Sequence, residues 1–186
     1  KNTSLIIWTT TPWTIPANKA LAYNKDINYV VLDINKNKIV VAEELIQSVI
    51  ENCELGKHEV LKTFKGSEFN NTLCSHPFKN LGYEYDVPML EANFVTLDQG
   101  TGIVHCAPSH GPDDFNLCLK NGMKAIETVN NDGVYTKNIP IFEGTHVFKA
   151  DEIIIKNLKE QNNLLGSGSL MRSYPHSWRS KAPLVH

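Results

Sequence analysis

The chain has 186 residues, of which 41% are hydrophobic and 20% are charged, and its formal net charge is −2 at pH 7. These values lie near the globular average and argue against a disordered or coiled-coil protein, and the apolar runs are too short for a membrane span. The slight negative charge argues against a protein that grips nucleic acid along its backbone, because such binding needs many Lys and Arg contacts to phosphate. Binding of a few nucleotides in a pocket stays compatible with this charge.

The start of the chain and its cysteines indicate the compartment. Lys1 has no initiator Met and no secretory leader before it, which favours a fragment of a longer, cytoplasmic protein. The cysteines are Cys53, Cys74, Cys106 and Cys118. Because none of them forms a C-x-x-C pair, we expect reduced, mostly buried thiols and no zinc ribbon.

Hydrophobic patterns in the first half of the chain predict several strands and one helix. We expect strands at residues 4–8, 27–33, 38–42, 60–64 and 94–97, and a helix over residues 45–53 that stops near Gly56. The first strand should be buried and should end before Pro12, since proline cannot donate to a sheet ladder. Asn35-Lys36-Asn37 separates the second and third strands and is typical of a hairpin turn.

The second half predicts one more early strand, two helices and a last strand. We expect strands at residues 102–106 and 170–174, and helices over residues 112–122 and 151–158. Pro112 suits the first helical position, and Asp113 and Asp114 suit the first turn, where the helix dipole favours negative charge. Many short strands with a few helices between them predict an α+β fold, β-barrel-like with surrounding helices, in a single domain over residues 1–186.

A run of hydroxyl side chains follows the first predicted strand. Residues 8–18 read W-T-T-T-P-W-T-I-P-A-N, so four threonines and Asn18 lie close together. Threonine hydroxyls both donate and accept hydrogen bonds, and together they can hold ribose hydroxyls, a carbonyl oxygen or a water molecule. The two prolines stiffen the segment. Taken alone, such a run is more often a strand end followed by a proline-rich turn.

A second polar segment, residues 100–115, reads G-T-G-I-V-H-C-A-P-S-H-G-P-D-D-F. It is not a dinucleotide fingerprint, because His105 stands where the third glycine belongs, and it is not a zincin motif, because His105 and His110 are five residues apart. Ser109, His110 and Asp113 are too close in sequence to align as a catalytic triad. For Asp113, a first-turn role at the helix dipole is the favoured interpretation.

Together, the two segments resemble the two signature stretches of the isoleucyl-tRNA synthetase editing domain. Residues 173–183 (S-Y-P-H-S-W-R-S-K-A-P) are similar to the stretch where the chain of this family returns to the synthetase body. Many members carry Cys where Ser177 and Ser180 stand, so no metal site is expected from these two positions. The H-I-G-H and K-M-S-K-S stretches of class I synthetases are absent from the sequence, so we expect no amino-acid activation by this chain.

The resemblance implies a role for seven residues. Asp114 should bind the α-ammonium group of an aminoacyl substrate, and His105 should limit the size of the pocket. Thr10, Thr11 and Asp114 are the implied catalytic residues. The implied substrate-binding residues are Thr9, Thr10, Thr11, Thr14, Asn18, His105 and Asp114.

The implied reaction is the hydrolysis of the valyl ester on the terminal adenosine of tRNA(Ile), and also of valyl-adenylate. Valine and isoleucine differ by one methylene, which is worth about 1–3 kcal/mol in an apolar pocket, so a second site must remove valyl products. We expect direct attack by water, with no metal, no cofactor and no acyl-enzyme. The expected partners are the 3′ aminoacyl-adenosine end of tRNA(Ile) and the rest of a synthetase chain, with no membrane and a monomeric state.

Three alternatives stay open at the level of sequence. The domain could bind aminoacyl-adenosine without cleaving it, because no catalytic triad is visible. It could be the valyl- or leucyl-specific version of the same domain, although the Thr-Pro-Trp continuation after Thr10 and the presence of His105 argue against that version. A serine or metal hydrolase of another family fits the residue spacing least.

Overall fold

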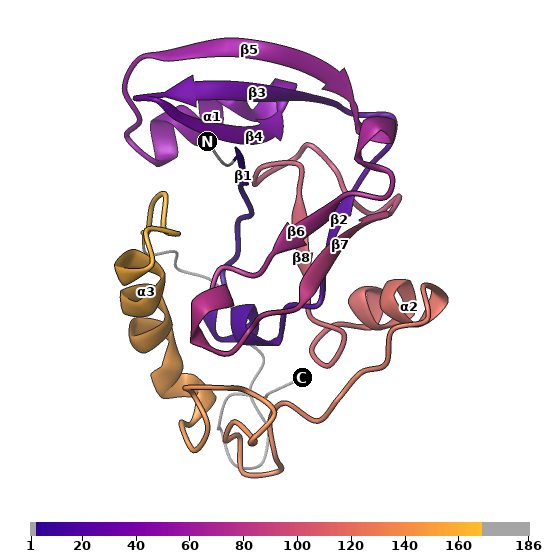
Figure 1. The fold of residues 1–186 in the computed structure, drawn as a ribbon, viewed down its shortest axis with the longest axis vertical. Helices are drawn as coiled ribbons and strands as arrows, with labels where there is room; N and C mark the ends of the chain where they lie inside the picture. The colour runs from indigo at the N-terminus through magenta and orange to yellow at the C-terminus, as the bar shows by residue number, and fades with distance from the viewer. Residues whose placement is uncertain (1–2, 169–186) are drawn as a thin grey trace.

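Residues 3–168 are described by a computed structural model, which shows an α+β fold built on two four-stranded mixed sheets (Figure 1). The strands are β1 (Thr3–Leu5), β2 (Ala20–Tyr23), β3 (Asn28–Ile34), β4 (Asn37–Ala42), β5 (His58–Lys65), β6 (Leu73–Ser75), β7 (Asp86–Glu91) and β8 (Val104–Cys106). The α-helices are α1 (Ile46–Asn52), α2 (Pro112–Lys120) and α3 (Ala150–Glu160). The 3-10 helices are η1 (Pro12–Ala17), η2 (Glu43–Leu45), η3 (Gly66–Phe69), η4 (Lys79–Leu81) and η5 (Val147–Lys149).

The first sheet has the strand order β1-β4-β3-β5. Its centre is the β3–β4 hairpin, whose two loop residues, Asn35 and Lys36, both have positive φ (53° and 69°). A two-residue loop with this geometry matches the right-handed twist of the strands that it joins. β1 pairs with β4 in parallel, and β5 pairs with β3 in the antiparallel sense.

The second sheet has the order β6-β7-β2-β8 and collects strands from more distant parts of the chain. β2 pairs in parallel with β7 and antiparallel with β8, and β6 pairs antiparallel with β7. The two sheets lie one above the other in Figure 1, and across the described residues neither of them closes into a barrel. The expected α+β class is confirmed, with two open sheets at its centre.

Alternation along the strands explains how the layers pack. In β3 and β4 one face packs on α1, and the other face packs on the second sheet. The second sheet turns its other face, with Ala20, Ala22 and Cys106, toward Cys118 of α2. A separate hydrophobic cluster joins η1 to α3. Helix η1, which carries Thr14, therefore packs against α3.

The α-helices and the hairpin confirm the predictions, whereas the strand predicted at residues 94–97 and the burial predicted for the first strand were wrong. Residues 94–97 form no strand: a turn occupies residues 93–94, and Val95 is buried. The first strand ends at Leu5, its residues are exposed or half-buried, and Trp8 is exposed. β2, β6 and β7 were not predicted. The strand predicted at residues 170–174 and the stretch 173–183 lie outside the described residues.

None of the helices within residues 3–168 has the length and the apolar character that a membrane crossing requires.

Candidate functional site

The threonine segment folds back on itself at the start of η1. The Thr9 hydroxyl accepts a hydrogen bond from the Thr11 amide at 3.0 Å and lies 3.3 Å from the Thr11 hydroxyl. The amide and the hydroxyl of Thr14 both donate to the Thr11 carbonyl, at 3.0 and 2.9 Å. Thr10 is half-buried between these residues. The hydroxyl groups of Thr9, Thr11 and Thr14 are therefore held by local hydrogen bonds, next to a stiff, proline-containing helix.

Strand β8 holds the end of this segment. The Thr14 hydroxyl lies 3.2 Å from Nε2 of His105, which is 91 residues away in the sequence. The Cys106 amide donates to Oδ1 of Asn18 at 3.2 Å, and the Lys19 amide donates to the Cys106 carbonyl at 2.9 Å. Asn18 is buried, so its side chain serves this bond and not solvent. The structure thus brings together Thr14, Asn18 and His105.

The hydrogen-bond network fixes the tautomer of His105. Since the Thr14 hydroxyl gives its proton to the Thr11 carbonyl, it must accept from His105, and Nε2 of His105 carries the hydrogen. Nδ1 is then an acceptor. Among the side chains of residues 3–168, it is the only buried nitrogen or oxygen without a hydrogen-bond partner. Burial, followed by the nearby His110, lowers the pKa of His105 to about 4, so the ring is neutral at pH 7.

Asp114 lies in the first turn of α2 and reaches back toward β8. Its Oδ2 accepts a hydrogen bond from the Ala107 amide at 2.8 Å. Burial raises the pKa of Asp114, the Ala107 amide opposes this shift by stabilising the charged form, and Asp113 adds to the rise. Asp113 itself is exposed in the same turn, as its expected role at the helix dipole requires.

Three consecutive residues at the end of β8 therefore organise the predicted site. His105 contacts Thr14, the Cys106 amide holds Asn18, and the Ala107 amide holds Asp114. The contacts place the threonine segment and Asp114 on one short scaffold, although they come from parts of the chain about a hundred residues apart. The pairing of Asp114 with the Ala107 amide was not expected from sequence.

Sequence reasoning also missed side chains that support η1 from the core. Tyr85 donates its hydroxyl hydrogen to the Asn18 carbonyl at 2.8 Å, and Nε2 of His76 lies 3.2 Å from the Ile15 carbonyl. Both rings come from the segment around η4 and were unremarkable in the sequence. The available signal was indirect: Pro16 removes a backbone donor from η1, so the helix needs hydrogen-bond partners from outside.

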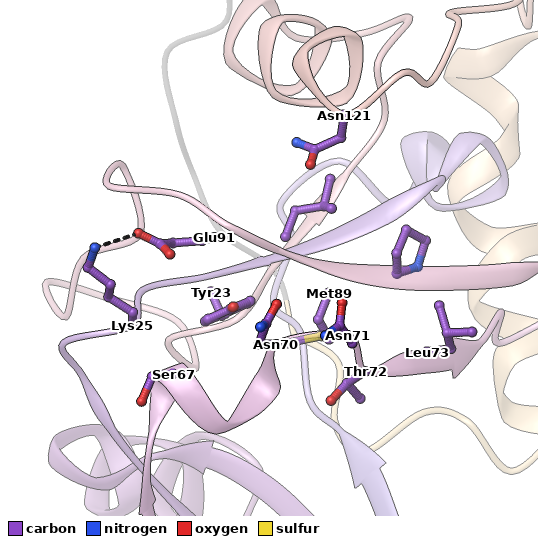
Figure 2. A pocket seen from close by; sticks show the side chains of 12 residues that line it. Tyr23, Lys25, Ser67, Asn70, Asn71, Thr72, Leu73, Met89, Glu91 and Asn121 are labelled. Atoms are coloured by element: carbon purple, nitrogen blue, oxygen red, sulfur yellow. Dashed lines mark ion pairs between the residues drawn. The ribbon is translucent and has the colours of Figure 1, made fainter.

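A cavity of about 660 Å³ lies elsewhere, over β2, β6 and β7 (Figure 2). Amide and hydroxyl side chains such as Asn70, Asn71 and Thr72 line it, and the Lys25–Glu91 ion pair (3.0 Å) stands at one end in Figure 2. None of the seven predicted site residues lines this cavity. Its lining includes no histidine and no close pair of acids, so it lacks the groups for acid–base chemistry.

Neither a metal-binding cluster nor a reactive thiol is present among residues 3–168. Within residues 3–168, no group of three His, Cys, Asp or Glu side chains is arranged to hold a metal ion. The four cysteines are free thiols, of which two are buried and two are half-buried. Burial raises the pKa of Cys106, and it raises the pKa of Cys118 to about 11, so both remain protonated at neutral pH.

Comparison with known proteins gives the family of the chain. Residues 1–165 match the family described as "Leucyl-tRNA synthetase, editing domain". The chain belongs to the family of aminoacyl-tRNA synthetase editing domains. This membership confirms the domain type that the two signature segments suggested.

Isoleucine–tRNA ligases are among the proteins whose sequences are similar to that of this chain. The chain is 66% identical to the isoleucine–tRNA ligase of Pelagibacter ubique and 45% identical to that of Gluconobacter oxydans, over 100% and 98% of its length. It spans about a fifth (21%) of each of these relatives.

Solved structures share the fold of the editing domain. The crystal structure of GlLeuRS-CP1 superimposes with a TM-score of 0.70 at 18% identity and covers 89% of this chain and 84% of its own. The editing domain of the Plasmodium falciparum cytosolic leucyl-tRNA synthetase gives 0.65 at 13% identity and covers 86% and 78%. At these identities the likeness establishes the architecture alone.

Proposed function

We propose that this editing domain hydrolyses the ester between valine and the terminal adenosine of tRNA(Ile), and that it spares the isoleucyl ester. The observation that carries the proposal is the joint anchoring of Thr14, Asn18 and Asp114 on residues 105–107. Family membership and the similarity to isoleucine–tRNA ligases support the choice of substrate.

In this proposal the charge of Asp114 selects the substrate. Oδ2 of Asp114 already accepts from the Ala107 amide, which leaves Oδ1 to receive the α-ammonium group of an aminoacyl ester. A carboxylate and an ammonium group form a charge-assisted hydrogen bond that a substrate without the amine cannot make. The hydroxyl groups of Thr9, Thr10 and Thr11 then hold the ester and the attacking water, and the ring of His105 limits the space for the side chain.

The residues of the site favour direct attack by water. Ser109 gives its only hydroxyl hydrogen to the Ile126 carbonyl at 2.6 Å, so it does not donate to a histidine as the nucleophile of a triad must. The two cysteines closest to the site, Cys106 and Cys118, are protonated at neutral pH because of their raised pKa values. An activated ester needs only a positioned water and hydrogen-bond donors for the developing oxyanion.

The decisive experiment compares Asp114→Asn with Asp113→Asn in a deacylation assay with mischarged valyl-tRNA(Ile). Asparagine keeps an oxygen for the Ala107 amide and removes the charge, so the fold should survive while the substrate ammonium loses its partner. We expect hydrolysis by Asp114→Asn to fall roughly 10–100-fold, the usual loss for one charge-assisted bond. Asp113→Asn removes the same charge from the exposed side of the turn and should retain activity. Equal rates in the two variants would remove Asp114 from the site.

The same assay separates the alternatives. Binding of a non-hydrolysable valyl-adenosine analogue without turnover of the ester would indicate a binding module. Turnover of mischarged tRNA(Leu) or tRNA(Val) in preference to valyl-tRNA(Ile) would indicate a neighbouring specificity, in line with the leucyl name of the matching family. Loss of turnover on addition of a chelator would contradict the metal-free mechanism.

A further inference from the structure

The 3-10 helix η1, which carries Thr14, has backbone groups that it cannot satisfy by itself. In a 3-10 helix, each carbonyl bonds to the amide three residues later. Pro16 stands three residues after Trp13 and has no N–H, so the Trp13 carbonyl lacks its helical donor. The Trp13 amide lies in the first turn and has no helical acceptor. One residue next to Thr14 therefore leaves both its backbone donor and its backbone acceptor open.

Two side chains from the far end of the chain satisfy both groups. The Tyr135 hydroxyl donates to the Trp13 carbonyl from 122 residues away. Oδ1 of Asp151 accepts from the Trp13 amide at 3.0 Å from 138 residues away. The backbone amide and the backbone carbonyl of Trp13 are thus both held by distant side chains, and we call these two hydrogen bonds the clamp. Trp13 immediately precedes Thr14, whose hydroxyl contacts His105.

We propose that Tyr135 and Asp151 are positioning residues of the hydrolytic site, which hold η1 so that the Thr14 hydroxyl meets the ring of His105. This proposal rests on the proposed function, in which the threonine segment holds the ester. Both residues bond to the backbone of Trp13, so each acts on Thr14 through that backbone.

The surroundings of both residues make them rigid supports. Asp151 lies in the first turn of α3, and that helix is anchored through Ala150, Ile154 and Leu158 in the same core cluster as Trp13. Tyr135 is 2% exposed and packs against Phe142. Burial and, to a lesser degree, Asp151 raise the pKa of Tyr135, so its hydroxyl remains a donor across the range of assay pH.

The rigidity matters because hydrolysis by a positioned water depends on geometry. A misplacement of about 1 Å can cost a factor of roughly 100 in rate even when it originates far from the reacting atoms. A shift of Trp13 would move Thr14 and with it the ring of His105, which in the proposed function limits the space for the substrate side chain. Loss of the clamp should therefore lower the rate constant of the bound ester more than its affinity.

The first test compares Tyr135→Phe with Tyr83→Phe in single-turnover hydrolysis of valyl-tRNA(Ile) by excess protein. Tyr83 is a matched control: it is buried in the same cluster and also donates to a carbonyl, that of Pro140, at 2.8 Å. We expect Tyr135→Phe to lower the rate constant at least roughly tenfold with little change in the half-saturating concentration, and Tyr83→Phe to leave both nearly unchanged. Equal losses in the two variants, matching their losses of thermal stability, would overturn the proposal.

The second test compares Asp151→Ala with Glu152→Ala, which remove one negative charge each from the first turn of α3. Only Asp151 bonds to the Trp13 amide. We expect Asp151→Ala to lower hydrolysis of the valyl ester and to raise the relative rate on isoleucyl-tRNA(Ile), and Glu152→Ala to change neither. Equal kinetics for both variants would show that Asp151 acts only through the charge at the start of α3, and this result would overturn its positioning role.

The NMR signals of the His105 ring test the positioning role of Tyr135 and Asp151 without a measurement of hydrolysis. The ring resonances of His105 should shift in Tyr135→Phe and in Asp151→Ala but not in their controls, because only the former change the contact with Thr14. If the unmodified protein fails to cleave valyl esters, the proposed function is wrong, yet these resonances still report on the clamp. Unchanged His105 resonances in both Tyr135→Phe and Asp151→Ala would overturn the proposal that these two residues position η1.

Discussion

The ring of His105 has two nitrogens with different roles. Nε2 donates to the Thr14 hydroxyl, and Nδ1 is buried without a partner among residues 3–168. A buried acceptor without a partner costs about 1–3 kcal/mol, so a residue that served packing alone would be better replaced by an apolar side chain. The unpaired Nδ1 therefore fits the proposal that His105 serves the binding site, where its ring would discriminate between substrates.

The size limit proposed for His105 can be tested by His105→Ala. Removal of the ring should open space for one more methylene, so that isoleucyl-tRNA(Ile) becomes a substrate. A methylene is worth about 1–3 kcal/mol in an apolar pocket, and we expect the preference for the valyl ester to fall by roughly tenfold or more. The measurement is the ratio of the two deacylation rates.

His58→Ala is the control for this variant, because His58 lies exposed at the start of the edge strand β5. In His58→Ala, the ratio of the deacylation rates on the valyl and isoleucyl esters should equal that of the unmodified protein. A His105→Ala protein that still spares the isoleucyl ester would show that another residue sets the limit.

At the scale of elements, the approach to β8 depends on a close contact between the two sheets. Gly102 has a φ of +77°, and a Cβ atom built on it would lie 2.4 Å from Cβ of Ala42. Its carbonyl accepts a hydrogen bond from the buried hydroxyl of Tyr29 at 2.7 Å, and the Ala42 amide donates to the Thr101 carbonyl at 2.8 Å. The turn before β8 is thereby fixed to the first sheet, and the position of His105 follows from it.

Gly102→Ala should therefore destabilise the protein by about 2–4 kcal/mol, from the sum of overpacking and a strained backbone. The free energy of unfolding in urea measures this loss. Gly122→Ala is the matched control, because Gly122 has a similar φ of +75° with no atom within 4 Å of its hypothetical Cβ. If both variants lose the same free energy, the contact with Ala42 contributes nothing.

Elements with strong local signals were predictable from the sequence, and elements defined by partners were not. The hairpin around Asn35 and Lys36 and the helix that begins at Pro112 carry turn and capping residues that act within a few positions. By contrast, β7 contains Pro88, which lacks a ladder donor, and β2 has only four residues. Both are strands because distant strands pair with them, which no local pattern records.

The predicted site divides along the same line. The seven predicted residues lie in the two signature segments, and long-range hydrogen bonds join the segments at Thr14, Asn18 and His105. The clamp on Trp13 could not be predicted, because its partners lie more than a hundred residues away and carry no motif. The roles of all seven residues in substrate binding and hydrolysis stay predictions.

At the scale of the whole molecule, His76 connects the second sheet to η1. Its ring is buried, with the Phe78 amide donating to Nδ1 at 3.1 Å, so Nε2 carries the hydrogen and donates to the Ile15 carbonyl. The ring also stacks on Tyr83, with centroids 4.5 Å apart. Burial lowers the pKa of His76 to about 3, against the opposing effect of the hydrogen bond to the Ile15 carbonyl.

This lowered pKa predicts a loss of stability in acid. The unfolded chain takes up a proton at His76 near its ordinary pKa of 6.5, whereas the folded chain does so only near 3. The unfolded state therefore binds more protons between these values, and stability is full above 6.5 and falls as the pH drops through this window. The slope that one such group contributes is about 1.4 kcal/mol per pH unit, and His105 adds its own contribution above pH 4.

His76→Asn isolates the contribution of His76, because the asparagine oxygen can still accept from the Phe78 amide. We expect this variant to be less stable at pH 7 but to show a shallower fall between pH 6 and pH 4, measured by urea unfolding at each pH. His58→Asn, on the exposed edge strand, should keep the slope of the unmodified protein. An identical slope in His76→Asn would mean that His76 is protonated in the folded state as well.

The order of strands also bears on how the chain reaches its native state. Three strands of the first sheet are neighbours in sequence, from Asn28 to Lys65, so they can pair as soon as that stretch exists. The second sheet must join β2 to β7 and β8 across intervals of more than sixty residues, and such non-local closure is slow. The scaffold at residues 105–107 belongs to this late part. Folding intermediates should therefore contain an ordered hairpin sheet while the residues of the proposed site are still far apart, and amide hydrogen exchange should protect β3 before β8.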